Sequence, residues 1–282
     1  MPVIARRMSR ILFFASLGLA VLLVVVTVVA YREAKHLETA SIEIVLPRLP
    51  REFEGFRILF LSDLHLFNDS AYTQKVRDHV ARVNADIAAI AGDFMDMHAT
   101  ERETLDQLRI LLPAFQRFQK IYAVKGNQDS TRLMLELEKL GIRVLRGERD
   151  ILKRGNATLG IAGVSSPFSE TALNRSLQQM HAGAKPLPDC QILLSHSPDV
   201  VLRESSRKAD LILAGHTHGG QIRLPWIGPL LTRTRLGRRY ASGSFTFGST
   251  QLFITRGVGT TYVPLRLLCP PEIVMITLRS KI

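Results

Sequence analysis

The stretch Leu211-Ile212-Leu213-Ala214-Gly215-His216-Thr217-His218-Gly219-Gly220-Gln221 decides the predicted fold, because it joins a buried strand to a pair of histidines. In extended backbone, residues i and i+2 point to the same side, so His216 and His218 can converge on one ligand. Neutral imidazole is the commonest nitrogen ligand for divalent metals. The stretch alone leaves two interpretations open, a metal site and two unconnected surface histidines.

Five apolar runs along the chain, including this one, end in polar side chains that can bind a metal. These side chains are Asp63, His65, Asp93, Asn127, His196, His216 and His218. In α/β sheets, ligands bind beyond the carboxyl ends of the strands, where the loops carry the reactive groups. Each residue taken singly has an ordinary role as a cap, a turn residue or a core histidine. Together, seven such residues at strand ends predict one shared site.

Seven ligands are too many for one tetrahedral zinc site, which takes four or fewer from the protein. They suit two divalent ions about 3.5–4 Å apart that share one carboxylate. Such a pair activates a water molecule and binds the negative oxygens of a phosphoryl group. The mixture of aspartate, asparagine and histidine suits manganese, iron or zinc and does not choose among them.

Strands and helices alternate from residue 56 onward, and the chain closes with strands only. Hydrophobic spacing predicts helices over 70–83, 101–118, 131–140 and 170–180. Apolar runs predict strands between them, and the tail from about residue 244 reads as strands. This order favours two sheets with helices outside, an α/β sandwich.

The N-terminus carries a segment that is suited to a membrane. Residues 11–31 contain no charged side chain and, at about 1.5 Å per residue, span roughly the 30 Å core of a bilayer. We interpret 11–31 as an uncleaved anchor behind the basic flank 1–10; a signal peptide cleaved after Ala30 is the alternative. Flanking charges slightly favour a position of the following domain outside the cytoplasm. Residues 32–55 are interpreted as a linker and first strand.

The formal net charge of +12 predicts anionic partners, which include nucleic acid, phosphorylated metabolites and an acidic membrane surface. Nucleic acid is disfavoured, because the anchor is present and no platform of interleaved aromatic and basic residues is found. Cys190 and Cys269 give neither a disulfide framework nor a zinc-finger spacing. The chain gives no indication of its oligomeric state.

The metal-binding motifs resemble those of a known family. Asp63-Leu64-His65, Gly92-Asp93, Gly126-Asn127-Gln128-Asp129, His196 and Gly215-His216-Thr217-His218 are similar, in order, to the five motifs of the calcineurin-like metallophosphoesterases. The resemblance covers the domain 56–282 and implies a four-layer α/β/β/α sandwich. It implies one metal on Asp63, His65 and His218. It implies a second metal on Asn127, His196 and His216, with Asp93 bridging. The implied catalytic residues are Asp93, Asn127, Gln128 and Asp129.

Segments 219–225 and 265–272 are similar to a membrane-associated bacterial branch of that family. This branch includes YaeI- and YkuE-type phosphodiesterases and LpxG-type UDP-2,3-diacylglucosamine pyrophosphatases of lipid A biosynthesis. The resemblance implies a hydrolase of the bacterial inner membrane that cleaves a phosphodiester or pyrophosphate in a lipid-linked substrate. The alternatives are a catalytically weak metal-binding scaffold and an envelope enzyme acting on soluble nucleotides.

Gln128 departs from the family pattern, which usually reads Gly-Asn-His-Asp and uses the histidine to assist the leaving group. An amide can donate a hydrogen bond but cannot give up a proton. General acid catalysis contributes typically about 10²–10⁴-fold, and a phosphate leaving group needs it less than an alkoxide does. Gln128 therefore favours a diphosphate or an activated diester over simple alkyl monoesters.

An apolar, turn-rich segment, 224–231, follows the last ligand loop, and four arginines follow that segment. One interpretation is a folded loop with solvated charges. The other is a lip on the bilayer, with an interfacial tryptophan and with arginines on phosphate groups. The second interpretation predicts substrate contacts by Trp226, Arg233, Arg235, Arg238 and Arg239.

Overall fold

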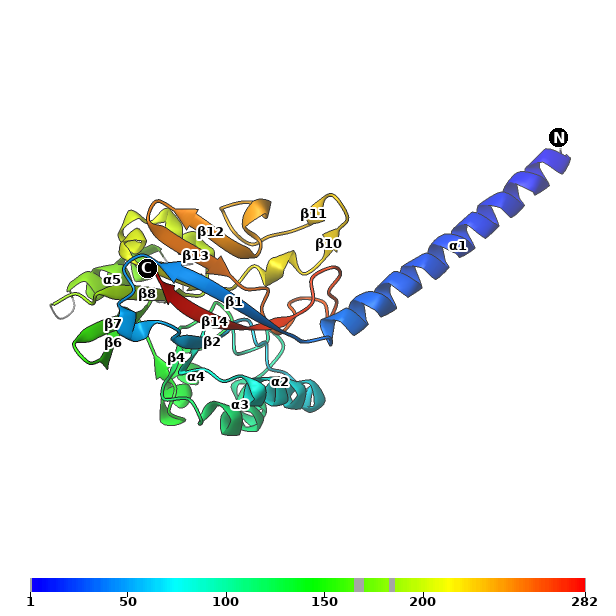
Figure 1. Ribbon diagram of the computed structural model, residues 1–282. Helices are drawn as coiled ribbons and strands as arrows, with labels where there is room; N and C mark the ends of the chain where they lie inside the picture. The colour runs from blue at the N-terminus through cyan, green and yellow to red at the C-terminus, as the bar shows by residue number, and fades with distance from the viewer. Residues whose placement is uncertain (1, 165–169, 183–185, 282) are drawn as a thin grey trace.

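The computed structural model describes residues 2–164, 170–182 and 186–281 (Figure 1). Two six-stranded sheets face each other, and helices cover the outer face of each. The predicted four-layer α/β/β/α sandwich is confirmed, and one long N-terminal helix precedes it. Residue 1, in the predicted basic flank 1–10, lies outside the described part of the chain. Residues 165–169, 183–185 and 282, in the predicted domain 56–282, also lie outside it.

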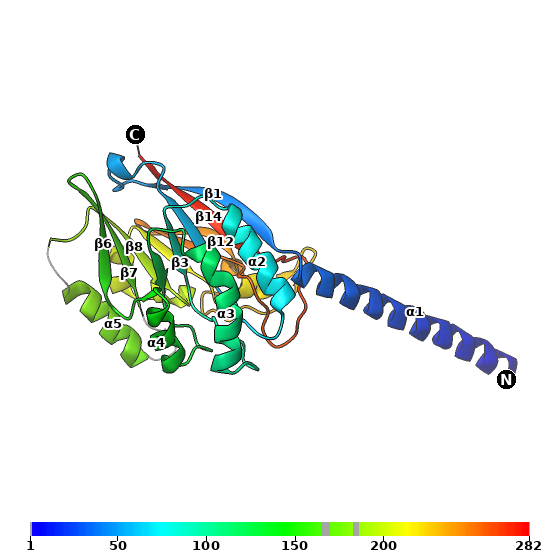
Figure 2. The same ribbon diagram turned by 90° about the horizontal axis from the view of Figure 1, so that it is seen from below.

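The first sheet has the strand order β1-β14-β2-β3-β4-β5. Its strands are β1 (Glu38–Leu46), β2 (Arg57–Leu61), β3 (Ile87–Ile90), β4 (Ile121–Ala123), β5 (Arg143–Val144) and β14 (Glu272–Ser280). Strands β2 to β5 are parallel, and β14 runs antiparallel to β2. The helices α2 (Ser70–Arg82), α3 (Glu101–Phe115) and α4 (Thr131–Lys139) cover its outer face (Figure 2).

The second sheet has the order β12-β13-β9-β8-β7-β6. Its strands are β6 (Arg149–Arg154), β7 (Ala157–Gly163), β8 (Cys190–Ser195), β9 (Leu211–Ala214), β12 (Gly243–Phe247) and β13 (Thr250–Ile254). Helix α5 (Glu170–Ala182) packs outside it, and a small hairpin of β10 (Arg223–Leu224) and β11 (Gly228–Pro229) follows β9. Strands β7, β8, β9 and β13 are parallel, so their carboxyl ends meet at one edge.

Strand β1 lies within the segment 32–55, which the sequence indicated as linker and first strand. It pairs in parallel with β14 over nine residues, from Glu38 opposite Glu272 to Leu46 opposite Ser280. The strand begins three residues earlier than its alternation predicted, because its first residues are only half buried at the edge of the sheet. The first sheet therefore contains chain from both ends of the protein.

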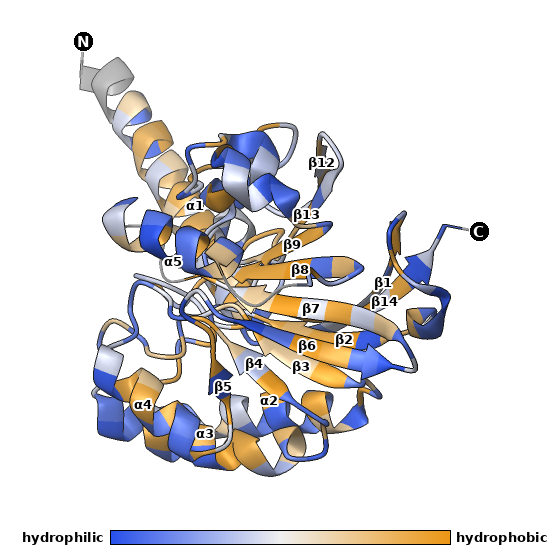
Figure 3. Ribbon diagram, turned by 90° about the vertical axis from the view of Figure 1, so that its left-hand side faces the viewer, coloured by the Kyte–Doolittle hydropathy of each residue, from blue (hydrophilic) through white to orange (hydrophobic). Residues whose placement is uncertain are grey.

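The main core lies between the two sheets. Phe60 of β2 is buried there and packs edge-to-face on Phe253 of β13, with ring centroids 6.2 Å apart. Both faces of the central strands are covered, so these strands are apolar throughout, whereas the outer helices show polar faces to solvent (Figure 3). The core thus fixes the position of one sheet relative to the other, including the edges at which their parallel strands end.

Helix α1 (Pro2–Ala34) extends away from the sandwich (Figure 1). Its part Arg7–Ala34 is long and apolar enough to cross a bilayer, and its apolar side chains are exposed along most of that length. The helix extends beyond the predicted span 11–31 at both ends, because the flanking residues also favour helix. Ala30 and Ala34, in its last turns, are buried against the domain.

We predict that Phe60→Ala lowers the free energy of unfolding by about 3–5 kcal/mol, because it leaves a cavity between the sheets. Urea denaturation of the protein in detergent, followed by circular dichroism, measures this change. Val45→Ala, at a side chain that is 48% exposed on β1, is the control and should change stability by less than about 1 kcal/mol. Equal effects of the two substitutions would contradict the assignment of the core.

Candidate metal centre

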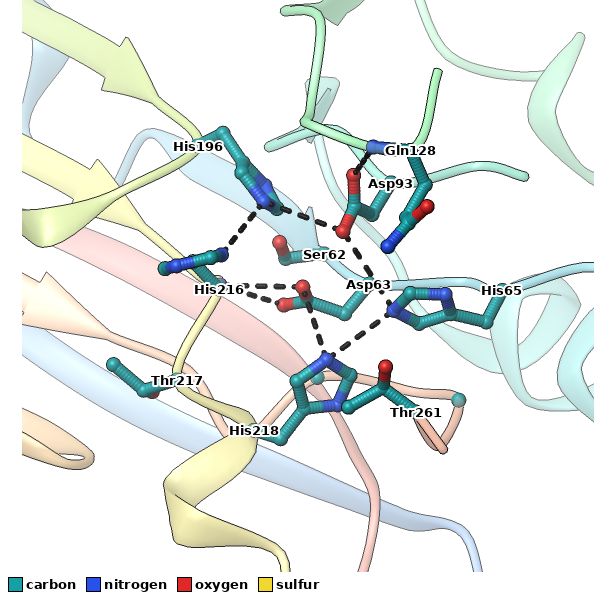
Figure 4. A network of polar contacts seen from close by, with 12 residues as sticks. Ser62, Asp63, His65, Asp93, Gln128, His196, His216, Thr217, His218 and Thr261 are labelled. Carbon is teal, nitrogen blue, oxygen red and sulfur yellow. Dashed lines mark hydrogen bonds and ion pairs between the residues drawn. The ribbon is translucent and has the colours of Figure 1, made fainter. Parts of the chain in front are cut away.

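The seven predicted ligands come from five loops at the carboxyl edges of the two sheets, and the structure brings all seven together (Figure 4). The first sheet supplies four of them, from the ends of β2, β3 and β4: Asp63, His65, Asp93 and Asn127. The second sheet supplies three, from the ends of β8 and β9: His196, His216 and His218. The site therefore exists only where the two sheets face each other.

The ligand loops turn sharply at the residues that carry the ligands. Five of the seven have left-handed backbone, with φ between 41° and 71°: Asp63, His65, Asp93, His216 and His218. This conformation costs roughly 1–2 kcal/mol for an L-residue, and such residues cluster at functional sites. The strain is tolerated here because hydrogen bonds and packing hold each loop over its strand end.

Two glycines permit the close approach of these loops. A Cβ atom on Gly215 would lie 1.8 Å from the Oγ atom of Ser62, so the loop after β9 could not meet the loop after β2. A Cβ atom on Gly92 would lie 2.5 Å from the backbone nitrogen of Gly126, which joins the loops after β3 and β4. Any side chain at either position would push ligands apart.

One group of ligands consists of Asp63, His65 and His218, all buried. The Nε2 atoms of His65 and His218 lie 3.2 Å apart, and the Nε2 atom of His218 lies 3.5 Å from Asp63 Oδ1. The Nδ1 atoms of both histidines have no hydrogen-bond partner within the described part of the chain. Among the described residues, no hydrogen bond to Nδ1 fixes the tautomer of either ring, so each histidine can carry its proton on Nδ1 and present the lone pair of Nε2 to the centre.

The second group contains His196, His216 and Asn127 (Figure 4 labels the two histidines). The Nδ1–H group of His196 donates to the carbonyl oxygen of Ala91 at 2.7 Å, which turns Nε2 toward the centre of the group. That Nε2 atom lies 3.0 Å from Asn127 Oδ1 and 3.1 Å from His216 Nδ1. Several acceptor atoms therefore converge on one point, an arrangement that a cation stabilises.

Asp93 lies between the two groups. Its Oδ2 atom is 3.7 Å from His65 Nε2 and 3.4 Å from His196 Nε2. Its Oδ1 atom accepts a hydrogen bond from the backbone N–H of Gln128 at 2.8 Å, which fixes the orientation of the carboxylate. Asp93 is thus placed to contact a metal in either group.

The electrostatics of the cluster follow from burial and crowding. Burial raises the pKa of Asp63. Burial and repulsion by the charge of His196 together lower the pKa of His216 to about 3. For His196, burial lowers the pKa, but the charge of Asp93 and a hydrogen bond to Asp93 raise it by more. The pKa of His196 is therefore raised to about 9. A positive charge is therefore favoured beside His196, and a metal ion that binds there replaces a proton.

The spacing of the donor atoms fits divalent ions. Ligand bonds of about 2.1 Å place neighbouring donor atoms about 3.0 Å apart in octahedral and about 3.4 Å apart in tetrahedral coordination. The donor pairs measured above, at 3.0 to 3.7 Å, lie in or near this range. Two divalent ions fit the site, one in each group.

Asp129 has contacts that differ from the catalytic role predicted for it. Its buried carboxylate accepts four hydrogen bonds from backbone N–H groups, those of Asp93, Phe94, Met95 and Gly126, at 2.8 to 3.1 Å. Both oxygens are committed to the backbone of the β3 and β4 loops. Asp129 is thus a positioning residue, and burial with the charge of Asp93 raises its pKa to about 6.

Arg266 is a functional residue that motif reasoning missed. Its side chain is fully buried, and its guanidinium group donates to the backbone carbonyl groups of His218, Arg256, Gly257, Gly259 and Cys269. It therefore fixes the loop that carries His218. A single charged residue inside the apolar run 263–269 was the available signal.

Gln128 was predicted to be catalytic, and its side-chain amide points toward His65 (Figure 4).

The predicted substrate residues are only partly brought together. Trp226 is fully exposed in the turn between β10 and β11. Arg233 stacks on Tyr262, 4.1 Å from the ring centroid, and lines two cavities beside the metal ligands. Of the other three, Arg235 lines one cavity, whereas Arg238 and Arg239 lie exposed and line neither.

Three cavities lie near the ligands. One, of about 280 Å³, is lined by the ligand His65 and by Tyr72, Val258 and Tyr262. A second, of about 350 Å³, lies beside His218 and is lined mainly by apolar side chains: Ile222, Leu230, Leu231, Tyr262 and Val263. The third, of about 620 Å³, lies beside Ser197, which follows His196 in the sequence, and is lined by more polar side chains, including Arg203 and Asp199. Cavities of different polarity therefore lie near the two groups of ligands.

A pair of divalent metal sites between the edges of two sheets defines a metal-dependent hydrolase. Residues 56–220 match the calcineurin-like phosphoesterase family. The chain is 30% identical over 266 residues to the metallophosphoesterase YkuE of Bacillus subtilis, covering 89% of this chain and 88% of YkuE. It is 29% identical over 231 residues to the phosphodiesterase YaeI of Escherichia coli, covering 79% and 82%.

The fold is also similar to that of TT1561 from Thermus thermophilus, with a TM-score of 0.50 and 16% identity over 72% of this chain and 90% of that one. The chain belongs to the calcineurin-like phosphoesterases and is a phosphoester hydrolase.

We predict that the metal-loaded protein contains about two metal ions per chain, and that His216→Ala and His218→Ala each retain about one, because each histidine belongs to a different group. Elemental analysis after dialysis measures this ratio. Adding Asp63→Asn to His218→Ala should leave about one ion, since both changes affect the same group. Combining His216→Ala with His218→Ala should leave almost none. Equal metal content of the two double variants would contradict the division of the ligands into two metal-binding groups.

Proposed function

We propose that this protein is a membrane-anchored, two-metal hydrolase that cleaves a phosphodiester or pyrophosphate bond in a lipid-linked substrate at the bacterial cell membrane. The apolar cavity beside His218 carries this proposal. It is lined by residues that flank the β10–β11 hairpin and by the loop near Tyr262, and both segments lie on the side of the domain from which α1 leaves (Figures 1 and 2).

The cavities beside His218 and Ser197 favour a substrate with one apolar and one polar end. A phosphoryl group at the metals would place its apolar part beside Leu230 and Leu231, whose side chains are 42% and 79% exposed. Its polar part would extend toward Ser197 and Arg203. Apolar pockets with a few placed polar groups are typical of ligand sites. A lipid joined through phosphate to a polar head group has this chemistry.

The residues of the chain have separate tasks in this reaction. Divalent ions in such a site supply a water-derived nucleophile at neutral pH and offset the negative charge of the phosphate. Asp93 and the histidines hold these ions, and Asp129 and Arg266 hold the loops that carry them. Gln128 is placed to donate a hydrogen bond from its amide to a phosphate or leaving-group oxygen.

The side of the membrane on which the catalytic domain lies decides between two classes of substrate. Lipid A precursors such as UDP-2,3-diacylglucosamine are expected on the cytoplasmic face, whereas an envelope phosphodiester requires the domain outside. The flanking charges slightly favour the outer position. An alkaline phosphatase reporter that is active when fused after Ile282 would exclude the precursor class, and an inactive one would support it.

We predict that the manganese-loaded protein hydrolyses bis(4-nitrophenyl) phosphate and that Asp93→Asn lowers kcat/KM at least about 10³-fold, because the residue between the two metals is changed. Release of nitrophenolate measures the rate. Asp78→Asn, at a surface aspartate that is 51% exposed on α2, is the control. Full activity of Asp93→Asn would overturn the two-metal mechanism.

The lipid-linked part of the proposal has its own test. We predict that kcat/KM is at least about tenfold higher for a diacylated nucleotide diphosphate than for its deacylated head group, through a lower KM. Leu231→Asp should remove this preference and leave hydrolysis of bis(4-nitrophenyl) phosphate within about twofold. Equal rates with and without acyl chains would overturn the lipid assignment and leave the phosphoesterase assignment intact.

We also predict that Gln128→His raises kcat for a diester with an alkyl leaving group by about tenfold or more, because imidazole can donate a proton and an amide cannot. Hydrolysis of the bis-aryl diester should change less than about threefold, since its leaving group needs no proton. The two rates are compared at pH 6 to 8. An equal change in both would show that residue 128 does not assist the leaving group.

A further inference from the structure

The C-terminal end of α1 is fixed to the catalytic domain. Ala30 and Ala34 are each only 4% exposed, and the carbonyl oxygen of Ala30 accepts a hydrogen bond from the backbone N–H of Arg266 at 2.9 Å. The carboxylate of Glu33 accepts one from the backbone N–H of Cys269. Four residues after the helix ends, β1 is already paired with β14. The helix therefore lacks a flexible tether and leaves the domain in a fixed direction.

The face of the domain beside this helix carries apolar side chains in contact with solvent. We call this set the apolar rim; its members are Trp226, Ile227, Leu231, Tyr262, Val263 and Leu268. The β10–β11 hairpin and the loop 262–268 that carry them lie on the side from which α1 extends, in both views of the ribbon (Figures 1 and 2). Exposed apolar side chains that gather on one side of a domain are typical of an interaction site.

If α1 crosses a bilayer, the fixed helix brings the apolar rim to the surface of that membrane. The rim and the helix then contact the same bilayer. Trp226 is fully exposed, and Tyr31, in the penultimate turn of α1, is 50% exposed. Tryptophan and tyrosine prefer the boundary between lipid and water. Arg32 lies exposed beside Tyr31, where it can meet lipid phosphates.

We propose that the apolar rim inserts into the interfacial layer of the same phospholipid bilayer that α1 crosses, and that the fixed end of α1 holds the domain in this position. The rim shares Leu231, Tyr262 and Val263 with the apolar cavity beside His218. The mouth of that cavity is thus at the lipid surface, and an amphiphile can reach the metals without passing through water. The proposal concerns a membrane contact and does not depend on which substrate is cleaved.

Trp226 is the only tryptophan of the sequence, so it reports on the rim directly. The full-length protein is placed in phosphatidylglycerol vesicles with and without brominated acyl chains. We expect blue-shifted emission that brominated lipid quenches at least about twofold. In the matched control, Trp226→Phe is combined with Leu135→Trp, at an exposed position on α4, and should remain unquenched.

Each other outcome overturns the proposal. Emission typical of water without quenching would show that the rim stays in solution. A blue shift without quenching by bromine, which grows with protein density, would show that a second copy covers the rim. If Trp226 is unquenched while acylated substrate is still preferred, the membrane contact fails and the proposed function stands.

The fixed helix end has a separate test. Ala34→Arg places a long charged side chain where α1 contacts the domain. We expect quenching of Trp226 by brominated lipid to fall at least about twofold, because the domain can then tilt away from the bilayer. Hydrolysis of bis(4-nitrophenyl) phosphate should stay within about twofold and thereby show that the domain is folded. Unchanged quenching would contradict the role of the helix end.

Discussion

The convergence of electron-pair donors at the ends of two sheets is the constraint on which this structure depends. Carboxylates, imidazoles and an amide oxygen approach within 3.0 to 3.7 Å in a buried space, where repulsion is weakly screened. The protein holds them there through its backbone. Asp129 binds four N–H groups, and Arg266 binds carbonyl groups of three segments. Metal binding then relieves the repulsion that the fold imposes.

The intersheet core sets the relation between the two halves of the centre. Each sheet supplies part of the ligands, so a change in sheet packing moves one set against the other. The contact of Phe60 with Phe253 and the close approach of Gly215 to Ser62 hold the two edges together. Left-handed backbone at five ligands shows that the loops are not in their preferred conformations. Stability of the core and affinity for metal are therefore expected to change together.

The metal ligands could be predicted from the sequence because their signals are local. An apolar strand that ends in an aspartate or a histidine is visible in a few residues, and parallel strands bring such ends to one edge. Arg266 and the four backbone bonds of Asp129 could not be predicted, because their partners lie in loops brought together only by folding. Sequence reasoning also placed Arg238 and Arg239 at the substrate, since proximity along the chain does not show that the loop turns away.

The position of β14 has a consequence for synthesis of the protein. This strand consists of residues near the C-terminus, yet it lies between β1 and β2 in the first sheet. Until β14 has been synthesised, β1 has no neighbouring strand and the first sheet cannot close. Strands β2, β3, β4 and β5 precede β14 in the chain and can pair with one another before it is made. The first sheet should therefore acquire β1, the first strand of the chain, as the last strand of its fold.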